Sequence, residues 1–255
     1  MMEYTQRNGP TTETVDRNWT GLYNISGILL ILIALISFGA AYGARILYSQ
    51  GYPGDPAAYL KLVAQHQRLA STTWTLWIIM DFLGLAPTIA MYIILQRYNR
   101  TLALLGSLLS LSYSIYDFGV TELNSLTLVS LGHGYALATT AVLKASFVAA
   151  ATYGYYALPL QTVLSFAIGS IGYLLWCVPM VRSFFGRWTA ITGVVVNVIG
   201  ILGSAAPLFP SSILLGLCQF LCVRLIALWF MVMGVQMFRH GHRLPDKVDN
   251  TTVVA

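Results

Sequence analysis

Four ionisable side chains lie within segments that are otherwise apolar: Asp81, Asp117, Glu122 and Arg224. A charged group at membrane depth costs about 2.5 to 3.5 kcal/mol on insertion scales, so it needs an oppositely charged partner or a watery cavity. These residues are therefore the first candidates for an ion or solute site. The sequence contains no Walker loop, zinc-protease His-Glu pair or Gly-x-Ser-x-Gly elbow, so it assigns no catalytic residue.

Asp81 and Arg224 are predicted to lie at similar depths. Asp81 is about nine residues from the outer end of its segment and Arg224 about twelve, and at 1.5 Å per residue their depths differ by about 5 Å. We expect them to form an ion pair. The pair either holds two helices together or belongs to an ion or substrate site, and a buried pair by itself is weak evidence for the second role.

Asp117 and Glu122 lie toward the outer end of one predicted helix, at the level of His66 and Arg68 in the connection before the second apolar segment. One interpretation is an outer vestibule lined by these four side chains together with Lys144. The interpretation that we favour from the sequence leaves Glu122, His66 and Arg68 solvated at the membrane interface, with Asp117 alone partly buried.

Tyr113 and Tyr116 precede Asp117 on the same predicted helix and could direct their hydroxyls at a shared ligand. Tyrosine is also common at membrane interfaces for packing reasons. Cys218 and Cys222 are four residues apart on one helical face, but two thiols without a third ligand do not define a metal site. The sequence therefore predicts no metal site and identifies no cofactor.

The composition places the chain in a lipid bilayer. Hydrophobic residues make up 57% of the sequence and charged residues 9%, whereas soluble domains carry about 25% charged residues. The net charge of +5 does not indicate a nucleic-acid partner, because the basic residues stand singly or in pairs beside apolar segments. We assign these basic residues to the ends of membrane spans.

We predict an all-α polytopic bundle. A bilayer core requires roughly 20 apolar residues as helix, and six segments meet this requirement: 21–43, 72–95, 101–122, 160–181, 188–208 and 212–238. No long polar linker separates them, so residues 21–238 are predicted to form one transmembrane domain. Residues 1–20 and 239–255 are predicted to be polar cytoplasmic tails.

Residues 134–157 are apolar enough to form a seventh span, and charge counting decides against it. With six spans, nine basic residues lie on the cytoplasmic side and four outside, in agreement with the positive-inside rule. The nine are Arg7, Arg17, Arg97, Arg100, Arg182, Arg187, Arg239, Arg243 and Lys247, and the four are Arg45, Lys61, Arg68 and Lys144. We therefore expect 134–157 to be an interfacial or partly buried helix on the outer side of a cell membrane, with both termini cytoplasmic.

Small residues recur at helical spacing in two predicted spans, as packing faces do. They are Ser165, Gly169 and Gly172 in one, and Gly193, Asn197, Gly200 and Ser204 in the other.

Three functional hypotheses follow. The first is an accessory or scaffold subunit that binds other membrane proteins through these faces. The second is a carrier or receptor for a small solute, and the third is an intramembrane enzyme that uses Asp117 or Glu122 as acid or base.

Three short stretches resemble the prokaryotic six-span family known as domain of unknown function 4386. They are Asp55-Pro-Ala-Ala58, the run Leu95 to Leu104, and Gly172-Tyr-Leu174 followed by Arg182, Ser183, Phe184 and Arg187. The chain departs from the family pattern at the residue before Arg187, where a proline is usual, and at Val223-Arg224, where the family tends to carry a glutamate. The resemblance implies a six-span membrane bundle and no agreed activity.

Overall fold

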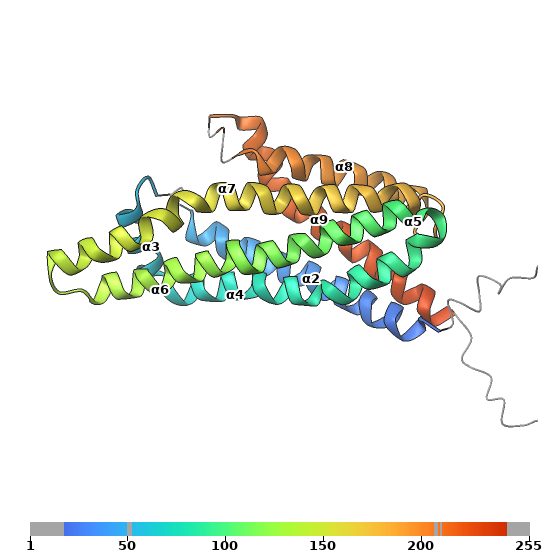
Figure 1. Ribbon diagram of the computed structural model, residues 1–255, viewed down its shortest axis with the longest axis horizontal. Helices are drawn as coiled ribbons and strands as arrows, with labels where there is room; N and C mark the ends of the chain where they lie inside the picture. Colours follow the sequence, from blue (N-terminus) through green and yellow to red (C-terminus); the bar gives the residue numbers. More distant parts are fainter. Residues whose placement is uncertain (1–17, 50–52, 207–208, 210, 244–255) are drawn as a thin grey trace, which may run out of the picture.

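The computed structural model describes residues 18–49, 53–206, 209 and 211–243, and helices account for nearly all of them. They assemble into an elongated bundle (Figure 1). The predicted tails 1–20 and 239–255 fall largely outside the described residues. The structure extends the bundle slightly at both ends, because its first helix begins at Thr20 and its last ends at Arg243.

Nine helical elements follow one another along the described chain. They are α2 (Thr20–Leu47), α3 (Pro56–Gln65), α4 (Gln67–Leu83), α5 (Leu85–Tyr116), the π-helix η1 (Asp117–Glu122), α6 (Leu123–Leu137), α7 (Ala141–Met180), α8 (Gly186–Ser204) and α9 (Ile213–Arg243).

The predicted all-α membrane bundle is confirmed at this level. Within the described residues, five helical stretches are long and apolar enough to cross a membrane. They are Thr20–Leu47, Gln67–Leu137, Ala141–Met180, Gly186–Ser204 and Ile213–His242.

The stretch Gln67–Leu137 turns back on itself at Asn99. This residue leaves helical geometry, with φ −160° and ψ 99°, and its side-chain Oδ1 accepts a hydrogen bond from the Leu102 backbone N–H at 3.1 Å. Asparagine is a preferred N-cap because it satisfies a helix's first free N–H groups. Figure 1 shows α5 folding back at this point. The chain therefore contains five to six apolar helices that could span a membrane.

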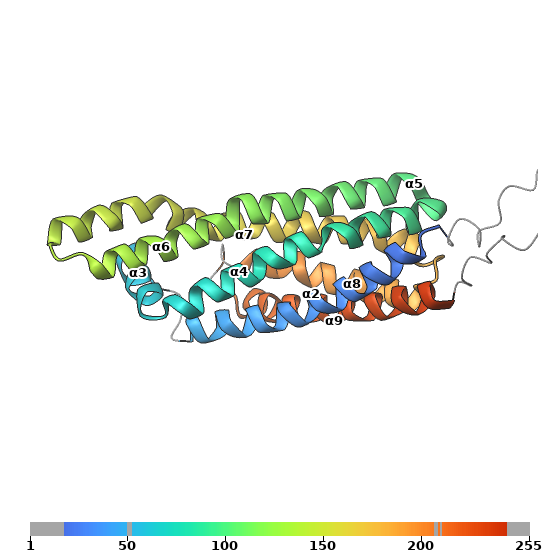
Figure 2. The same cartoon turned by 90° about the horizontal axis from the view of Figure 1, so that it is seen from below.

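The structure changes our interpretation of residues 134–157. They do not form a separate helix: α6 ends at Leu137, and the 40-residue α7 starts at Ala141 and runs through Pro159 to Met180. Such a helix is about 60 Å long, twice the roughly 30 Å of a bilayer core. The α6–α7 hairpin accordingly projects past the ends of the other long helices (Figures 1 and 2).

Side-chain hydrogen bonds and buried aromatic groups stabilise this hairpin. The Asn124 amide donates to the Gly154 carbonyl at 2.9 Å and to Gln161 Oε1 at 2.8 Å, which ties α6 to α7. Tyr59 of α3 is fully buried against Tyr155 of α7, with ring centroids 5.6 Å apart. The projecting end thus has its own apolar core, separate from the core of the main bundle.

Helices α2 and α9 approach each other closely through glycine. A Cβ atom added at Gly27 would lie 2.7 Å from the Gly234 carbonyl oxygen, and one added at Gly234 would lie 2.6 Å from the Gly27 carbonyl oxygen. Small residues at such crossings allow membrane helices to pack backbone to backbone. The contact places the start of α2 and the end of α9 at the same end of the bundle (Figure 2).

We predict that Gly27→Ala destabilises the protein by about 1 to 3 kcal/mol, because the new methyl group overpacks the α2–α9 contact. The measurement is thermal unfolding of the purified protein in detergent. Gly21→Ala is the matched control, since a Cβ there meets no atom within 4 Å. An equal melting temperature for the two variants would contradict the close contact.

Candidate functional site

Three acidic side chains from α4 and η1 gather inside the bundle. Asp81 lies near the end of α4, and Asp117 and Glu122 lie at the two ends of η1. Their exposed fractions are only 6%, 5% and 3%. The expectation that Glu122 is solvated at the interface is therefore wrong, because the π-helix turns this residue inward.

The π-helix brings Asp117 and Glu122 to the same side of the chain. In an α-helix, residues five apart point about 140° away from each other. A π-helix forms hydrogen bonds between residues five apart, so such residues lie one above the other, and these helices are frequent at functional sites. The local geometry of η1 thus directs both carboxyl groups into the bundle.

Hydroxyl groups support Asp117. Ser165 of α7 donates a hydrogen bond of 2.6 Å to Asp117 Oδ1, and the hydroxyls of Tyr113 and Thr121 lie beside the same carboxyl group. Ser165 itself is fully buried. Asp117 is consequently tied to α7 through Ser165.

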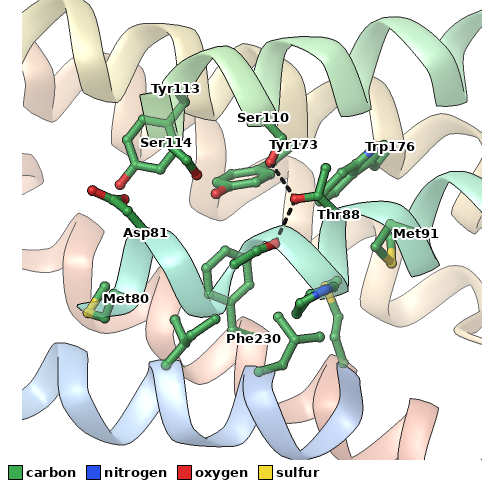
Figure 3. Close-up of a pocket in the computed structure, with 15 residues that line it drawn as sticks. Met80, Asp81, Thr88, Met91, Ser110, Tyr113, Ser114, Tyr173, Trp176 and Phe230 are labelled. Carbon is green, nitrogen blue, oxygen red and sulfur yellow. Dashed lines mark hydrogen bonds between the residues drawn. The ribbon is translucent and has the colours of Figure 1, made fainter. Parts of the chain in front are cut away.

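Asp81 and Glu122 are less satisfied. Asp81 Oδ2 and Glu122 Oε2 are buried and accept no hydrogen bond from any residue that the structure describes. Tyr113 and Ser114 are the labelled side chains nearest to Asp81 in Figure 3. A buried acceptor without a partner destabilises the folded state by about 1 to 3 kcal/mol, and more if the group is charged. These two oxygen atoms thus have no hydrogen-bond partner among the described residues.

The expected ion pair between Asp81 and Arg224 does not form. The Arg224 guanidinium donates to the Phe220 carbonyl and lies over the Phe220 ring, 3.8 Å from its centroid. Asp81 instead lines a cavity together with Tyr113 and Ser114. Similar depth in the membrane did not predict the contact between Asp81 and Arg224, because the Arg224 side chain lies along α9 against Phe220.

Four cavities lie around the acidic residues. The largest of the four has a volume of about 530 Å³ and is bounded by Tyr48, Leu158, Pro159 and Phe209. The second, of about 210 Å³, is lined by Asp117, Thr121 and Glu122. We call the first the apolar chamber and the second the acidic chamber. Two smaller cavities of about 40 Å³ each lie beyond them, and Asp81 lines one of these.

Neighbouring cavities share lining residues, so they lie next to one another in a series. The apolar and acidic chambers share Trp74, Thr162 and Gln219. The acidic chamber meets the next cavity at Trp77, Phe166 and Val223, and this cavity meets the Asp81 cavity at Met80, Tyr113, Tyr173 and Phe230.

The innermost cavity carries further hydroxyl groups (Figure 3). Thr88 Oγ1 donates to the Gly84 carbonyl at 2.9 Å and lies 3.3 Å from Ser110 Oγ. Both hydroxyls line the same cavity as Asp81. The far end of the series is therefore polar, although most of its walls are aromatic or aliphatic.

The two predicted tyrosines have different places. Tyr113 lines two of the cavities, whereas Tyr116 lines none of the four.

The sequence analysis did not identify Ser165, Trp74 and Gln219 as residues of the site. Ser165 and Gln219 were visible as polar residues within predicted spans, but nothing in the sequence indicated which helix face would meet η1.

No metal cluster is formed by the part of the chain that the structure describes: no three His, Cys, Asp or Glu side chains are placed to hold one ion. The Trp74 indole Nε1–H is buried and has no acceptor among the described residues. The acidic chamber therefore offers free acceptors, a free donor and aromatic walls, a combination suited to an organic polar ligand.

The small-residue faces are used within the chain. A Cβ on Gly172 would meet the Gly106 carbonyl oxygen at 3.0 Å, and one on Gly193 would meet Cys177 Sγ at 2.7 Å. Gly200 likewise abuts Ser170 of α7. These contacts join α5, α7 and α8 to one another, so the faces that we expected to bind other subunits are already occupied.

Comparison with protein families gives one match. The family model described as Domain of unknown function (DUF4386) matches residues 25–238. No curated protein and no solved structure matches the chain. The match covers every residue of the cavity series.

We predict that Asp81→Asn and Arg224→Leu have additive effects on the free energy of unfolding, within about 0.5 kcal/mol, because the two side chains share no contact. The measurement is a double-mutant cycle by chemical or thermal unfolding in detergent. A coupling energy well above this value would contradict the structure and indicate that Asp81 and Arg224 form an ion pair.

A second cycle, of Asp117→Ala with Ser165→Ala, is the positive control. Their hydrogen bond predicts a coupling of about 1 kcal/mol or more. Additivity here would mean that Ser165 does not hold Asp117.

Proposed function

We propose a function from the geometry of the site, since the chain belongs to the Domain of unknown function (DUF4386) family, whose description assigns no activity. The protein is a multi-pass membrane carrier or receptor that binds a small cationic solute between α4, η1 and α7. Asp81, Asp117 and Glu122 supply the negative charge. The site requires no metal and no catalytic residue.

The observation that carries this proposal is the pair of buried, unpartnered carboxylate oxygens beside a cavity. An ionised carboxylate away from water is stable only when it is paired, and none of the described residues that line the acidic chamber or the Asp81 cavity is basic. A bound cation would supply the missing charge. Intramembrane acidic residues commonly mark such solute or proton pathways.

The walls of the acidic chamber suit an ammonium group. Trp74 and Trp77 line it together with Asp117 and Glu122. The face of an indole ring attracts a cation by about 0.5 to 2 kcal/mol, depending on desolvation. Its volume of about 210 Å³ admits a small organic head group with a few waters.

Interrupted helices beside the site support a role in transport. Helix α4 ends at Leu83 and α5 begins at Leu85, with Pro87 in its first turn, and η1 interrupts the helix that continues as α6. Broken helices at membrane depth are tolerated where they line a cavity, and transporters often bind substrates there. Pro87 and Gly84 line the same cavity as Asp81.

The proposed topology has six spans with both termini in the cytoplasm of a cell. Helix α2 starts and helix α9 ends at the same end of the bundle, where α5 also folds back (Figures 1 and 2). An even number of crossings fits this arrangement. The distribution of Arg and Lys supports the cytoplasmic assignment of that end.

We predict that propylammonium binds the purified protein and quenches its tryptophan fluorescence, whereas propanol and propionate do not. The reason is that Trp74 and Trp77 line the chamber that contains Asp117 and Glu122. The double variant Asp117→Asn, Glu122→Gln should weaken binding at least tenfold, because each neutral amide keeps the shape of the acid and removes its charge.

Asp55→Asn is the matched control. Asp55 is an exposed acid that caps α3 by accepting from the Ala58 N–H at 2.8 Å, and asparagine retains this cap. Its propylammonium affinity should equal that of the unmodified protein. Equal affinity for propanol and propylammonium would refute a cation site.

An accessory subunit of a membrane complex is the second candidate, and an intramembrane enzyme the third. The second is favoured by large apolar side chains on the α6–α7 hairpin, where Leu137 and Val142 are 67% and 79% exposed and Tyr153 is 80% exposed. Exposed apolar patches often mark protein or membrane contacts. This surface would replace the small-residue faces as the binding region.

For the accessory role, the expected result is that native mass spectrometry of the gently extracted protein retains additional large subunits. Val142→Asp should remove them, because it places a charge within the exposed patch. Ile213→Asp is the control, since Ile213 is 90% exposed but lies at the start of α9. A lone chain in all three samples would exclude this role.

A further inference from the structure

We propose that the solute is an amphiphilic ammonium compound, with its cationic head in the acidic chamber and its apolar body in the apolar chamber. This inference rests on the proposed function and names the class of its ligand. It is carried by the position of two adjacent chambers, which share Trp74, Thr162 and Gln219 and differ in chemistry and in size.

The apolar chamber is large enough for an organic group. Its volume of about 530 Å³ lies within the 300 to 1,000 Å³ typical of ligand pockets. Tyr48 and Trp74 bound it on one side, Leu158 and Pro159 on another, and Phe209 closes it between α8 and α9. No charged residue is among the described residues that line it. A free ion would therefore gain nothing from this space, whereas an alkyl or aryl group would gain hydrophobic stabilisation.

The two chambers meet at a polar boundary. Trp74, Thr162 and Gln219 line both, and beyond them the walls include Asp117 and Glu122. The buried Trp74 Nε1–H has no acceptor among the described residues. Along this path the lining changes from apolar to hydrogen-bonding to anionic, which matches the order of groups in an amphiphile with a cationic end.

The path leads outward at the α8–α9 connection. Phe209 lines the apolar chamber and is 57% exposed, so it forms part of the rim. Tyr48, directly after α2, lies on the same chamber. The apolar chamber therefore lies between the surface and the acidic residues, and a ligand that entered head first would leave its apolar body behind in it.

The charges exclude an anionic or zwitterionic ligand of the same shape. No Lys, Arg or His is among the described residues that line either chamber, so a phosphate or carboxylate would face Asp117 and Glu122 without a partner. Arg224 does not relieve this, since its guanidinium lies on the Phe220 ring. The ligand class is accordingly a cation with one apolar substituent.

The test is a titration of the full chain in phosphatidylcholine nanodiscs with ethyl-, butyl- and hexylammonium, followed by tryptophan fluorescence. Empty nanodiscs correct for partitioning into the lipid. Each methylene that enters the apolar chamber should tighten binding by up to about fourfold, equivalent to 0.8 kcal/mol. We expect hexylammonium to bind at least tenfold more tightly than ethylammonium, and hexanol and hexanoate not to reach the site.

Gly216→Phe tests the position of the apolar body. Gly216 lines the apolar chamber, and a Cβ there meets no atom within 4 Å, so the new ring has room to fill the chamber without disturbing the helices. This variant should lose the preference for hexylammonium and retain ethylammonium binding. Leu214→Phe is the control, because Leu214 is 67% exposed and lines neither chamber.

The outcomes separate the two proposals. Carboxylate-dependent binding of ethylammonium with no gain for hexylammonium would overturn the amphiphilic ligand and leave the cation site standing. A gain that survives Gly216→Phe would equally overturn the assignment of the apolar chamber. If no ammonium compound binds, both proposals fail.

Discussion

The burial of three carboxyl groups in an apolar helical bundle is the constraint around which this structure is organised. Asp81, Asp117 and Glu122 are each at most 6% exposed, and no basic side chain is among the described residues that line the cavities beside them. A carboxylate in such surroundings is destabilising unless it finds a partner. The π-helix η1, the α4–α5 junction, the Ser165 hydroxyl that supports Asp117 and the acidic chamber all lie next to these groups.

The rest of the bundle holds this region in place by close contacts between helices. Glycine lets α2 approach α9 at Gly27 and Gly234, and lets α5 approach α7 at Gly106 and Gly172. Because lipid gives no hydrophobic drive for association between spans, such packing is a main source of stability in membranes. These close helix contacts surround the cavities but do not fill them. The cavities therefore lie inside a bundle whose helices are otherwise packed backbone to backbone.

The cavities order the chemistry of the site. Their walls change from apolar at Leu158 and Phe209 to anionic at Asp117 and Glu122 and then to the hydroxyls beside Asp81. A ligand that passed along them would exchange hydrophobic contacts for charge pairing. The same series explains why the interrupted segments η1 and the α4–α5 junction lie where they do, since irregular backbone in a membrane must border a cavity or other protein.

Composition and apolar segment length were sufficient to predict the all-α membrane bundle, because a bilayer permits few other folds. They also predicted the turn near Asn99 and singled out the acidic residues, whose charge stands out in lipid. Only the tertiary structure decided which acids meet, because partners depend on helix rotation. It buried Glu122 through a π-helix, turned Arg224 onto Phe220 and joined residues 141–157 to the helix that follows. The depth of a residue in the membrane follows from its position along its own span. The direction of its side chain depends on how all the helices pack together.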